Sequence, residues 1–227
     1  MGERIATFKV RGIEIRLVKD WKIYMPSAAT RLIAENLHDV NGLRVLDLGT
    51  GSGVLAILAS KLGAESVVAT DVSERAVRIA RRNAEINHVE IDFRVGDVFD
   101  PIKDELFDLI ICNPPMTPSP AQLPRFTWGG VDGRLILDRV VDGAPKHLRR
   151  AGRLLLPVVS LVGIGRTYQM LLRKGFIPKV LDYQVHPFGK TLHRLLNHLK
   201  SLPDSDYIYD HLGRICWRAV LFEAIKT

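Results

Sequence analysis

The sequence predicts an α/β fold in one domain, with a mostly parallel sheet and helices on both of its faces. From residue 43 onward, short apolar runs alternate with helix-sized segments, which is the order that produces βαβ units. These runs are mostly continuous rather than alternating with polar residues, as is typical of strands buried on both faces. The length of 227 residues, 47% of them hydrophobic, suits one full-sized core.

A small β-hairpin and one helix are expected before this alternation begins. Residues 8–17 alternate apolar and polar side chains across a turn at Gly12, a pattern typical of a hairpin. A short extended segment is predicted at residues 21–25. Ser27 is expected to cap the helix that follows. The apolar face of this helix consists of Leu32, Ile33 and Leu37.

Seven strands and four further helices are expected along the rest of the chain. The strands are predicted at residues 43–48, 66–70, 90–95, 107–112, 153–161, 176–185 and 215–225. The helices are predicted at residues 54–62, 73–87, 134–148 and 166–174. Gly63 and Gly175 are expected to end two of them.

Residues 187–214 interrupt this order and are interpreted as an insertion. They are too polar for an ordinary crossover, and they contain a short basic amphipathic segment at residues 192–200. The predicted division of the single domain is therefore a β extension at 1–25, a catalytic core at 26–186, the insertion at 187–214 and a last strand at 215–227.

Basic charge is concentrated in the last third of the chain. The net charge is +7, and residues 146–227 hold 14 Lys and Arg against 5 Asp and Glu, whereas the first 145 residues hold 18 against 20. A basic surface can contact RNA or a ribosome-associated partner. It can equally be a solvated surface that favours solubility, so both interpretations remain open.

The cysteines and apolar runs favour a cytoplasmic protein. Cys112 and Cys216 lie in apolar, strand-like surroundings, where free thiols pack in the core, and no disulfide framework or metal site is predicted. The charged N-terminus lacks the apolar region of a signal peptide. The longest apolar run, residues 154–164, is about half of a membrane span, so no membrane association is expected.

A glycine-rich loop joins the strand at 43–48 to the next helix. Gly49, Gly51 and Gly53 let the backbone approach a ligand closely and permit positive φ. A loop at a strand's carboxyl end and a helix N-terminus is where α/β sheets hold nucleotides. Asp71 ends the next strand about twenty residues later, where it can accept hydrogen bonds from both hydroxyls of a ribose.

Two details favour S-adenosyl-L-methionine over a dinucleotide. The glycines are spaced G-x-G-x-G, and Val54 stands where G-x-G-x-x-G requires a glycine. Asp47 would repel a pyrophosphate but suits the ammonium group of a methionine. Asp97, after the third strand, can reach an adenine amino group, although a helix-cap or turn role fits it equally well. The neighbouring Thr50, Val72 and Val98 complete this part of the predicted cofactor site.

The sequence Asn113-Pro114-Pro115 ends the fourth predicted strand. Two prolines stop a strand without any chemistry, because proline lacks the ladder donor. Beside the cofactor, however, the Asn113 side-chain oxygen and the Pro114 carbonyl can accept hydrogen bonds from both N–H groups of a planar nitrogen. The nitrogen would then face the methyl group in line with the departing sulfur. Orientation supplies roughly 7–11 kcal/mol in favourable cases, and fixed dipoles face the developing positive charge.

Taken together, these motifs resemble class I methyltransferases of the amino-methylating branch over roughly residues 24–186. Residues 24–30 look like the Pro-x-x-x-Ser/Thr segment of HemK-type protein-glutamine methyltransferases, and residues 128–133 look like their Gly-Gly-x-Asp-Gly stretch. The resemblance implies a Rossmann-like, seven-stranded class I methyltransferase sheet and S-adenosyl-L-methionine as cofactor. It also implies methylation of the glutamine in the Gly-Gly-Gln motif of translation release factors.

The same resemblance implies roles for particular residues. Asn113–Pro115 would be the catalytic element, and Thr30 and Asn113 would also contact the cofactor. The residues expected to bind the substrate are Tyr24, Pro26, Met116, Trp128, Gly130 and Asp132. Met116 departs from the family, which has an aromatic residue there that packs against the planar group of the substrate, so the substrate of this chain can differ.

Three other interpretations compete with glutamine methylation. An RNA methyltransferase acting on an exocyclic amine of adenine or guanine would use the same chemistry, and the basic last third favours it, whereas residues 128–133 favour glutamine. An inactive cofactor-binding partner subunit is disfavoured by the intact Asp47, Asp71 and Asn113. A nicotinamide oxidoreductase is disfavoured by the glycine spacing. The resemblance also suggests an activating partner subunit.

Overall fold

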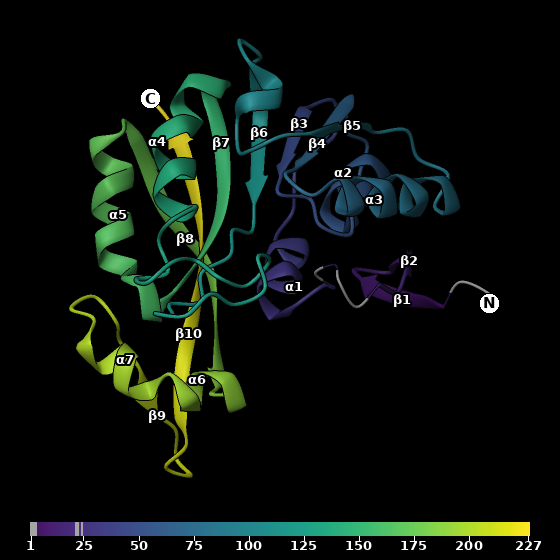
Figure 1. Ribbon diagram of the computed structural model, residues 1–227. Helices are drawn as coiled ribbons and strands as arrows, with labels where there is room; N and C mark the ends of the chain where they lie inside the picture. The colour runs from purple at the N-terminus through teal and green to yellow at the C-terminus, as the bar shows by residue number, and fades with distance from the viewer. Residues whose placement is uncertain (1–3, 21–22, 24) are drawn as a thin grey trace.

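The computed structural model describes residues 4–20, 23 and 25–227, and a twisted sheet forms its centre (Figure 1). Its strands are β3 (Arg44–Leu48), β4 (Ser66–Asp71), β5 (Asp92–Val95), β6 (Phe107–Cys112), β7 (Leu148–Val159), β8 (Phe176–Pro187), β9 (Ile208–Tyr209) and β10 (Ile215–Lys226). Among the described residues the order is β5-β4-β3-β6-β7-β10-β8, and β9 pairs with β10 off this path. The predicted seven-stranded α/β sheet is therefore confirmed.

The first five strands of this order, from β5 to β7, run parallel, and β10 is antiparallel to both β7 and β8. Leu48 at the end of β3 pairs with Thr70 of β4 and Cys112 of β6. The carboxyl ends of these three strands consequently meet at one edge of the sheet. Loops that leave such an edge beside a change of strand order are where α/β sheets hold ligands.

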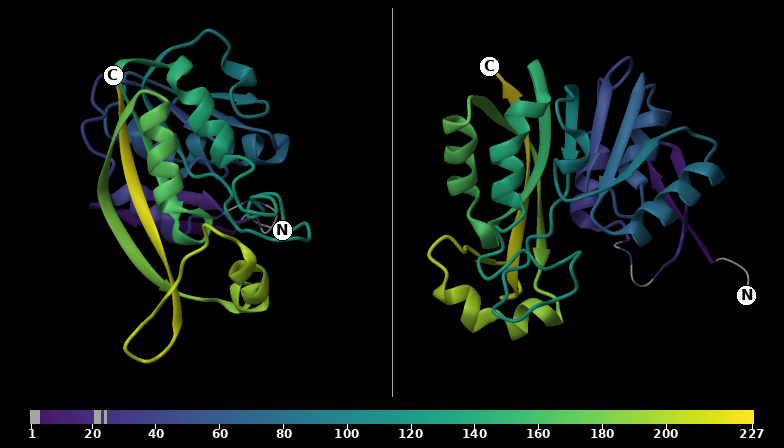
Figure 2. Two further views of the ribbon diagram at one scale, coloured as in Figure 1. Left: turned by 90° about the vertical axis from the view of Figure 1, so that its left-hand side faces the viewer. Right: turned by 45° about the horizontal axis from the view of Figure 1, so that its top comes forward.

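Helices cover both faces of the sheet, and the two further views in Figure 2 separate them. One face packs against α1 (Ala28–Glu35), α2 (Val54–Lys61) and α3 (Glu74–Ile86); the other packs against α4 (Leu137–His147), α5 (Ile164–Arg173) and the short 3-10 turns η1 (Asp100–Ile102) and η2 (Ser160–Val162). Ile57 of α2 and Val140 of α4 are fully buried in the two resulting cores. Burial of continuous apolar strands between two helix layers is the main favourable term for such a fold.

Two predicted boundaries differ from the structure around α4. The helix expected at 134–148 spans Leu137–His147 and is preceded by a turn. The buried Arg134 of this lead-in binds the Asp138 carboxylate at 2.6 Å and the Thr167 hydroxyl at 3.0 Å. The strand expected at 153–161 already begins at Leu148, which is fully buried. The pairing of β7 with β6 is irregular here, and Ala151 has φ 60°. This irregularity accommodates the polar residues Arg149 and Arg150, which do not follow a strand pattern in the sequence.

The expected N-terminal hairpin consists of β1 (Ile5–Val10) and β2 (Ile13–Val18), and it packs beside α2 and α3. The fully buried Asn83 of α3 accepts a hydrogen bond from Val18 N at 2.8 Å and donates one to Ser52 O, also at 2.8 Å. One side chain thereby ties the hairpin to the glycine loop. The extended segment expected at 21–25 lies partly outside the described residues.

The insertion at 187–214 folds into α6 (Lys190–Arg194), α7 (Leu196–Ser201) and β9. It lies at the end of the sheet where β6 ends (Figure 1). The predicted amphipathic segment at 192–200 is two short helices joined at Leu195. A separate apolar cluster of Leu161, Phe188 and Leu199 holds this segment against η2.

Both cysteines are buried free thiols, as predicted. Within the described part of the chain, no helix combines the length and apolarity that a membrane span requires. The cytoplasmic location stays a prediction.

Candidate active site

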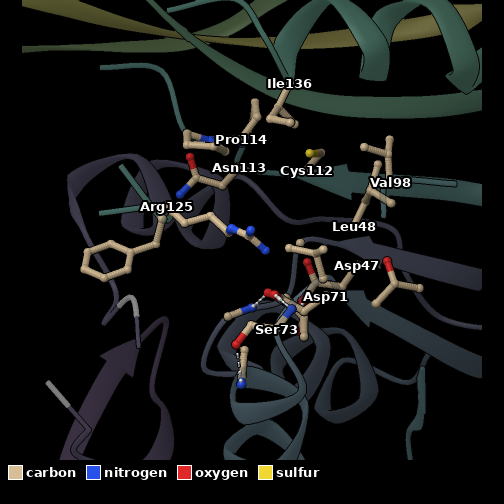
Figure 3. Close-up of a pocket in the computed structure, with 18 of the residues that line it drawn as sticks. Asp47, Leu48, Asp71, Ser73, Val98, Cys112, Asn113, Pro114, Arg125 and Ile136 are labelled. Carbon is tan, nitrogen blue, oxygen red and sulfur yellow. Dashed lines mark hydrogen bonds between the residues drawn. The ribbon is translucent and has the colours of Figure 1, made fainter. Parts of the chain in front are cut away.

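A cavity of about 690 Å³ opens at the carboxyl ends of β3, β4 and β6, a volume typical of small-molecule sites. Figure 3 shows residues of all three strands turned towards it. The predicted cofactor and catalytic residues that line it are Thr30, Asp47, Gly49, Thr50, Gly51, Asp71, Val72, Asp97, Val98, Asn113, Pro114 and Pro115. Residues far apart in the sequence are therefore brought together as the motifs predict.

The glycine loop and Asp71 hold each other in place. Gly51 N donates to one carboxylate oxygen of Asp71 and Ser73 N to the other, both at 2.9 Å. Burial raises the pKa of Asp71, while these N–H donors and the positive charge of Arg125 act in the opposite direction. Because each carboxylate oxygen can accept more than one hydrogen bond, Asp71 retains capacity for two ligand hydroxyls.

Gly53 has a packing role. Its φ is 81°, and a Cβ atom at this position would lie 3.0 Å from the Cβ of Ala80. Glycine therefore lets α2 begin close against α3. Gly53 is not among the described residues that line the cavity, so its contact with a cofactor stays a prediction.

Asp47 lies beneath the glycine loop with 2% of its surface exposed. Its Oδ2 atom accepts hydrogen bonds from Thr50 Oγ1 at 2.6 Å and from Ala56 N at 3.1 Å. Burial raises the pKa of Asp47 to about 6 despite these two donors, because removal of water disfavours the carboxylate. A cation bound in the cavity would favour the ionised form.

Asp97 and Val98 form the wall after β5. Asp97 is paired with Arg139 of α4, at 2.9 Å and 3.3 Å between the two oxygen–nitrogen pairs. Val98 has φ 49°, a conformation that costs a β-branched residue energy. This strained turn places Val98 beside Leu48 at the cavity (Figure 3). The sequence predicts a turn or ligand contact here but gives no sign of the partner Arg139.

Asn113 is oriented by Thr30. The Asn113 Nδ2 group donates to Thr30 Oγ1 at 3.1 Å. Thr30 is 3% exposed and belongs to the capping box of α1, in which it exchanges hydrogen bonds with Ser27. Since Nδ2 is held by Thr30, the Asn113 Oδ1 atom is left as an acceptor. The sequence places Thr30 near the cofactor, whereas the structure adds this orienting bond.

Arg125 is a site residue that sequence reasoning missed. Its guanidinium points into the cavity between Asn113 and Asp71 (Figure 3). It lies on the loop at 118–127, whose ends are joined by a hydrogen bond from Thr117 N to Thr127 O at 2.9 Å. No motif spacing relates this loop to Asp71, so only the folded chain reveals Arg125.

A second cavity of about 340 Å³ adjoins the first. The residues common to both linings are Asn113, Pro114, Pro115 and Phe126. The Asn-Pro-Pro element thus forms part of both cavities.

The predicted substrate residues divide between these places. Pro26 and Trp128 line the first cavity, and Met116 lines the second. Among the described residues, Gly130 and Asp132 line neither: Gly130 O accepts a bond from Ser119 N at 3.0 Å, and Asp132 Oδ1 accepts one from Arg134 N at 3.1 Å. Both hydrogen bonds shape the loop, and direct substrate contact stays a prediction. Tyr24 lies outside the described residues.

A family model described as the methyltransferase small domain matches residues 26–176, which contain the glycine loop, Asp71, Asp97 and Asn113–Pro115. The chain belongs to this family. It is an S-adenosyl-L-methionine-dependent N-methyltransferase, as the sequence predicts.

Two relatives resemble this methyltransferase over most of its length. It is 33% identical over 190 residues to a Methanocaldococcus jannaschii protein named "Putative protein N5-glutamine methyltransferase MJ0928", covering 81% of this chain and 95% of that one. It is 31% identical over 196 residues to the release factor glutamine methyltransferase of Lactococcus lactis, covering 78% of this chain and 70% of that one.

One similar solved structure is the E. cuniculi Mtq2–Trm112 complex, described as responsible for the methylation of the termination factor eRF1. The TM-score is 0.63 at 22% identity, over 91% of this chain and 99% of that one. At this identity the likeness shows the fold alone.

Proposed function

We propose that this methyltransferase acts on the side-chain amide nitrogen of a glutamine in a translation release factor. The observation that carries the proposal is the meeting of two cavities at Asn113–Pro115. The first has the groups that suit the methyl donor, and the second opens the same element to an acceptor from the other side. Methyl transfer requires donor and acceptor to meet in line at one point.

The first cavity fits S-adenosyl-L-methionine by the chemistry of its side chains. The Asp71 carboxylate suits the ribose hydroxyls, and the buried Asp47 carboxylate suits the ammonium group. Arg125 would supply a cation for the methionine carboxylate. When bound, the cofactor supplies an electrophilic methyl group.

Asn113 and Pro114 would hold the acceptor nitrogen. With Nδ2 bonded to Thr30, the Asn113 Oδ1 atom accepts one N–H of the target amide, and the Pro114 carbonyl accepts the other. Holding both N–H groups directs the face of the planar nitrogen at the methyl group. Fixed dipoles around the developing positive charge need no reorganisation during transfer, and the alkylated nitrogen then loses a proton to solvent.

The acceptor class follows from the relatives and from the second cavity. Both relatives that match over most of this chain carry glutamine methyltransferase names, and the described residues that line the second cavity include no ionisable side chain. The RNA interpretation relies on the basic last third, but at least six of its cations form ion pairs with carboxylates of the chain: Arg149, Arg153, Arg166, Lys174, Arg214 and Arg218. These pairs lower the charge available to phosphates.

Parallel labelling tests the proposal. The purified chain is incubated with tritiated S-adenosyl-L-methionine and either the release factor or total RNA of the same organism. We expect label in the release factor, and no label once the glutamine of its Gly-Gly-Gln motif is replaced by alanine. An Asn113→Ala enzyme controls for contaminating activity. Label in RNA alone would contradict glutamine as the acceptor.

A partner subunit is tested by the same assay. The similar Mtq2 structure contains Trm112, so we propose that a small companion subunit raises the activity of this chain too. Full labelling by the chain alone, unchanged after addition of cell extract from an enzyme-deletion strain, would contradict a need for a partner.

A further inference from the structure

The second cavity contains a feature that the family motifs do not describe, and its interpretation rests on the proposed function. Its walls come from the start of α1, the Asn-Pro-Pro element, the loop at 118–127, the end of β7 with η2, α6 and β10. Its lining residues are Ser27, Ala28, Ala29, Asn113, Pro114, Pro115, Met116, Thr117, Phe126, Thr127, Val159, Leu161, Leu192 and Trp217. Most of this lining is apolar, so a ligand that enters it exchanges water for hydrocarbon and ring surfaces.

Trp217 is the one tryptophan in the described lining of this cavity. It lies on β10 directly opposite His186 of β8, and the two ring centroids are 4.7 Å apart with 35° between the planes. Burial lowers the pKa of His186, because loss of water disfavours the charged ring. Cross-strand ring pairs of this kind stabilise one orientation of both side chains.

Trp217 lies where it can provide the aromatic surface that is missing at Met116. The resemblance implies an aromatic residue after the second proline that packs against the planar group of the substrate, and this chain has a buried methionine there. Met116 and Trp217 line the same cavity together with Asn113. A ring on β10, which β7 separates from β6 in the sheet, can supply the planar apolar surface that Met116 does not.

We propose that Trp217 forms the apolar face against which the target glutamine side chain lies while Asn113 and Pro114 bind its amide. The stem of glutamine is aliphatic and its amide is planar and neutral, so both parts match an indole face in a cavity lined by uncharged side chains. Trp217 is thus a substrate-positioning residue contributed by the last strand of the sheet.

Phe126 is the alternative aromatic group. It lines both cavities but lies on the loop at 118–127, and 36% of its surface is exposed. Trp217 lies on a strand that is hydrogen-bonded to its neighbours, and its ring contacts the tilted ring of His186. A fixed surface loses less conformational entropy when the substrate binds, which favours Trp217 over Phe126.

The insertion at 187–214 completes this cavity. Leu192 of α6 contributes to the wall, and the cluster of Leu161, Phe188 and Leu199 holds α6 and α7 in place. His198 of α7 donates from Nε2 to the Val131 carbonyl at 2.7 Å. The insertion is therefore bonded to the loop that follows the Asn-Pro-Pro element, as a wall of the acceptor site should be.

Steady-state kinetics on the release factor test this proposal. For Trp217→Leu we expect KM for the release factor to rise about tenfold or more, whereas Trp217→Phe, which retains a ring, should stay within about threefold of wild type. Affinity for S-adenosyl-L-methionine, measured by calorimetry, should not change in either variant. Tyr183→Leu is the matched control, since Tyr183 lies on β8 with 64% of its surface exposed.

A spectroscopic measurement covers the case in which Trp217→Leu fails to fold. Saturation of the wild-type enzyme with a Gly-Gly-Gln peptide should change tryptophan emission, and the Trp217→Phe enzyme should show a clearly smaller change, because Trp128 of the first cavity still contributes. Wild-type kinetics in Trp217→Leu, or an equal emission change in Trp217→Phe, would overturn the role of Trp217 alone. If the wild-type enzyme labels no release factor, the proposed function itself fails. A larger loss in Phe126→Leu than in Trp217→Leu would assign the aromatic face to Phe126.

Discussion

The two cavities that meet at Asn113–Pro115 differ most clearly in charge. The ionisable residues of the cofactor cavity include Asp47, Asp71, Asp97, Arg125 and Arg139, whereas the described lining of the acceptor cavity has none. The methyl donor carries an ammonium group, a carboxylate and ribose hydroxyls, so the groups that bind it must be placed at defined points. The acceptor cavity needs only shape and the two carbonyl oxygens. Substitutions on each side of Asn113 should therefore separate binding of the donor from transfer to the acceptor.

Asn113→Ala should separate cofactor binding from methyl transfer most strongly. We expect kcat to fall by about 10²–10³-fold, the loss typical of removing one fixed hydrogen-bonding group that stabilises a transition state. Cofactor affinity should remain nearly unchanged, because Asp47 and Asp71 are untouched. The measurements are single-turnover transfer and calorimetric titration. Equal loss of binding and transfer would mean that Asn113 is structural.

Asp71→Ala should weaken binding of the cofactor. Loss of hydrogen bonds to a charged group costs about 1.5–3 kcal/mol, so the Kd for S-adenosyl-L-methionine should rise roughly tenfold to 150-fold. Calorimetry measures the change, and a melting curve checks that the glycine loop remains folded. Glu74→Ala is the control, since Glu74 has 78% of its side chain exposed nearby on α3. Unchanged affinity in Asp71→Ala would remove Asp71 from the site.

The pH dependence of cofactor binding should report Asp47. Its pKa of about 6 means that the carboxyl becomes protonated as the pH falls through that value, and a protonated carboxyl attracts an ammonium group less. Affinity should thus be constant above this pH and fall by up to about tenfold for each unit below it.

Asp47→Asn isolates this effect from Asp71, whose pKa is also raised. The variant should bind S-adenosyl-L-methionine more weakly at neutral pH and lose part of the pH slope. A wild-type slope retained in Asp47→Asn would assign the titration to another group.

Thr30→Val should give the smallest effect. Valine has a similar shape but cannot accept the hydrogen bond from Asn113 Nδ2, so the Asn113 amide loses its fixed orientation. Loss of one neutral hydrogen bond, about 0.5–1.5 kcal/mol, predicts a two- to tenfold lower kcat at unchanged cofactor affinity. Thr30→Ser retains the hydroxyl and should restore most of the rate. A Thr30→Ser enzyme as slow as Thr30→Val would contradict an orienting role.

The sequence could predict most of the cofactor cavity because its residues lie at the ends of strands. Asp47 lies one residue before the end of β3, Asp71 ends β4 and Asn113 follows β6, and parallel strands bring such positions to one edge of the sheet. Spacing along the chain was therefore enough to predict most of the cofactor cavity. The succession of strands and helices along the chain, and the hairpin, followed from similarly local patterns of apolar residues.

The missed features depend on contacts between segments far apart in the sequence. Arg125 faces Asp71, Arg139 pairs with Asp97, and Thr30 bonds to Asn113, yet no local pattern marks these side chains as partners. The early start of β7 was hidden because its irregular pairing with β6 accommodates Arg149 and Arg150. Trp217 resembles any core residue of a last strand until the fold places it beside the Asn-Pro-Pro element.

The bond between His198 and Val131 has a consequence for how recognition can change in this family. The insertion and Trp217 lie beyond residue 176, where the match to the family model ends, while Val131 lies within it. Exchange of residues 187–214 between homologous enzymes would replace Leu192 and His198 together, and it would keep the bond to the Val131 carbonyl only where the incoming residue at position 198 is a donor. A chimaera that is meant to acquire a new protein target should therefore retain a hydrogen-bond donor at position 198, or receive residues 128–133 together with the insertion.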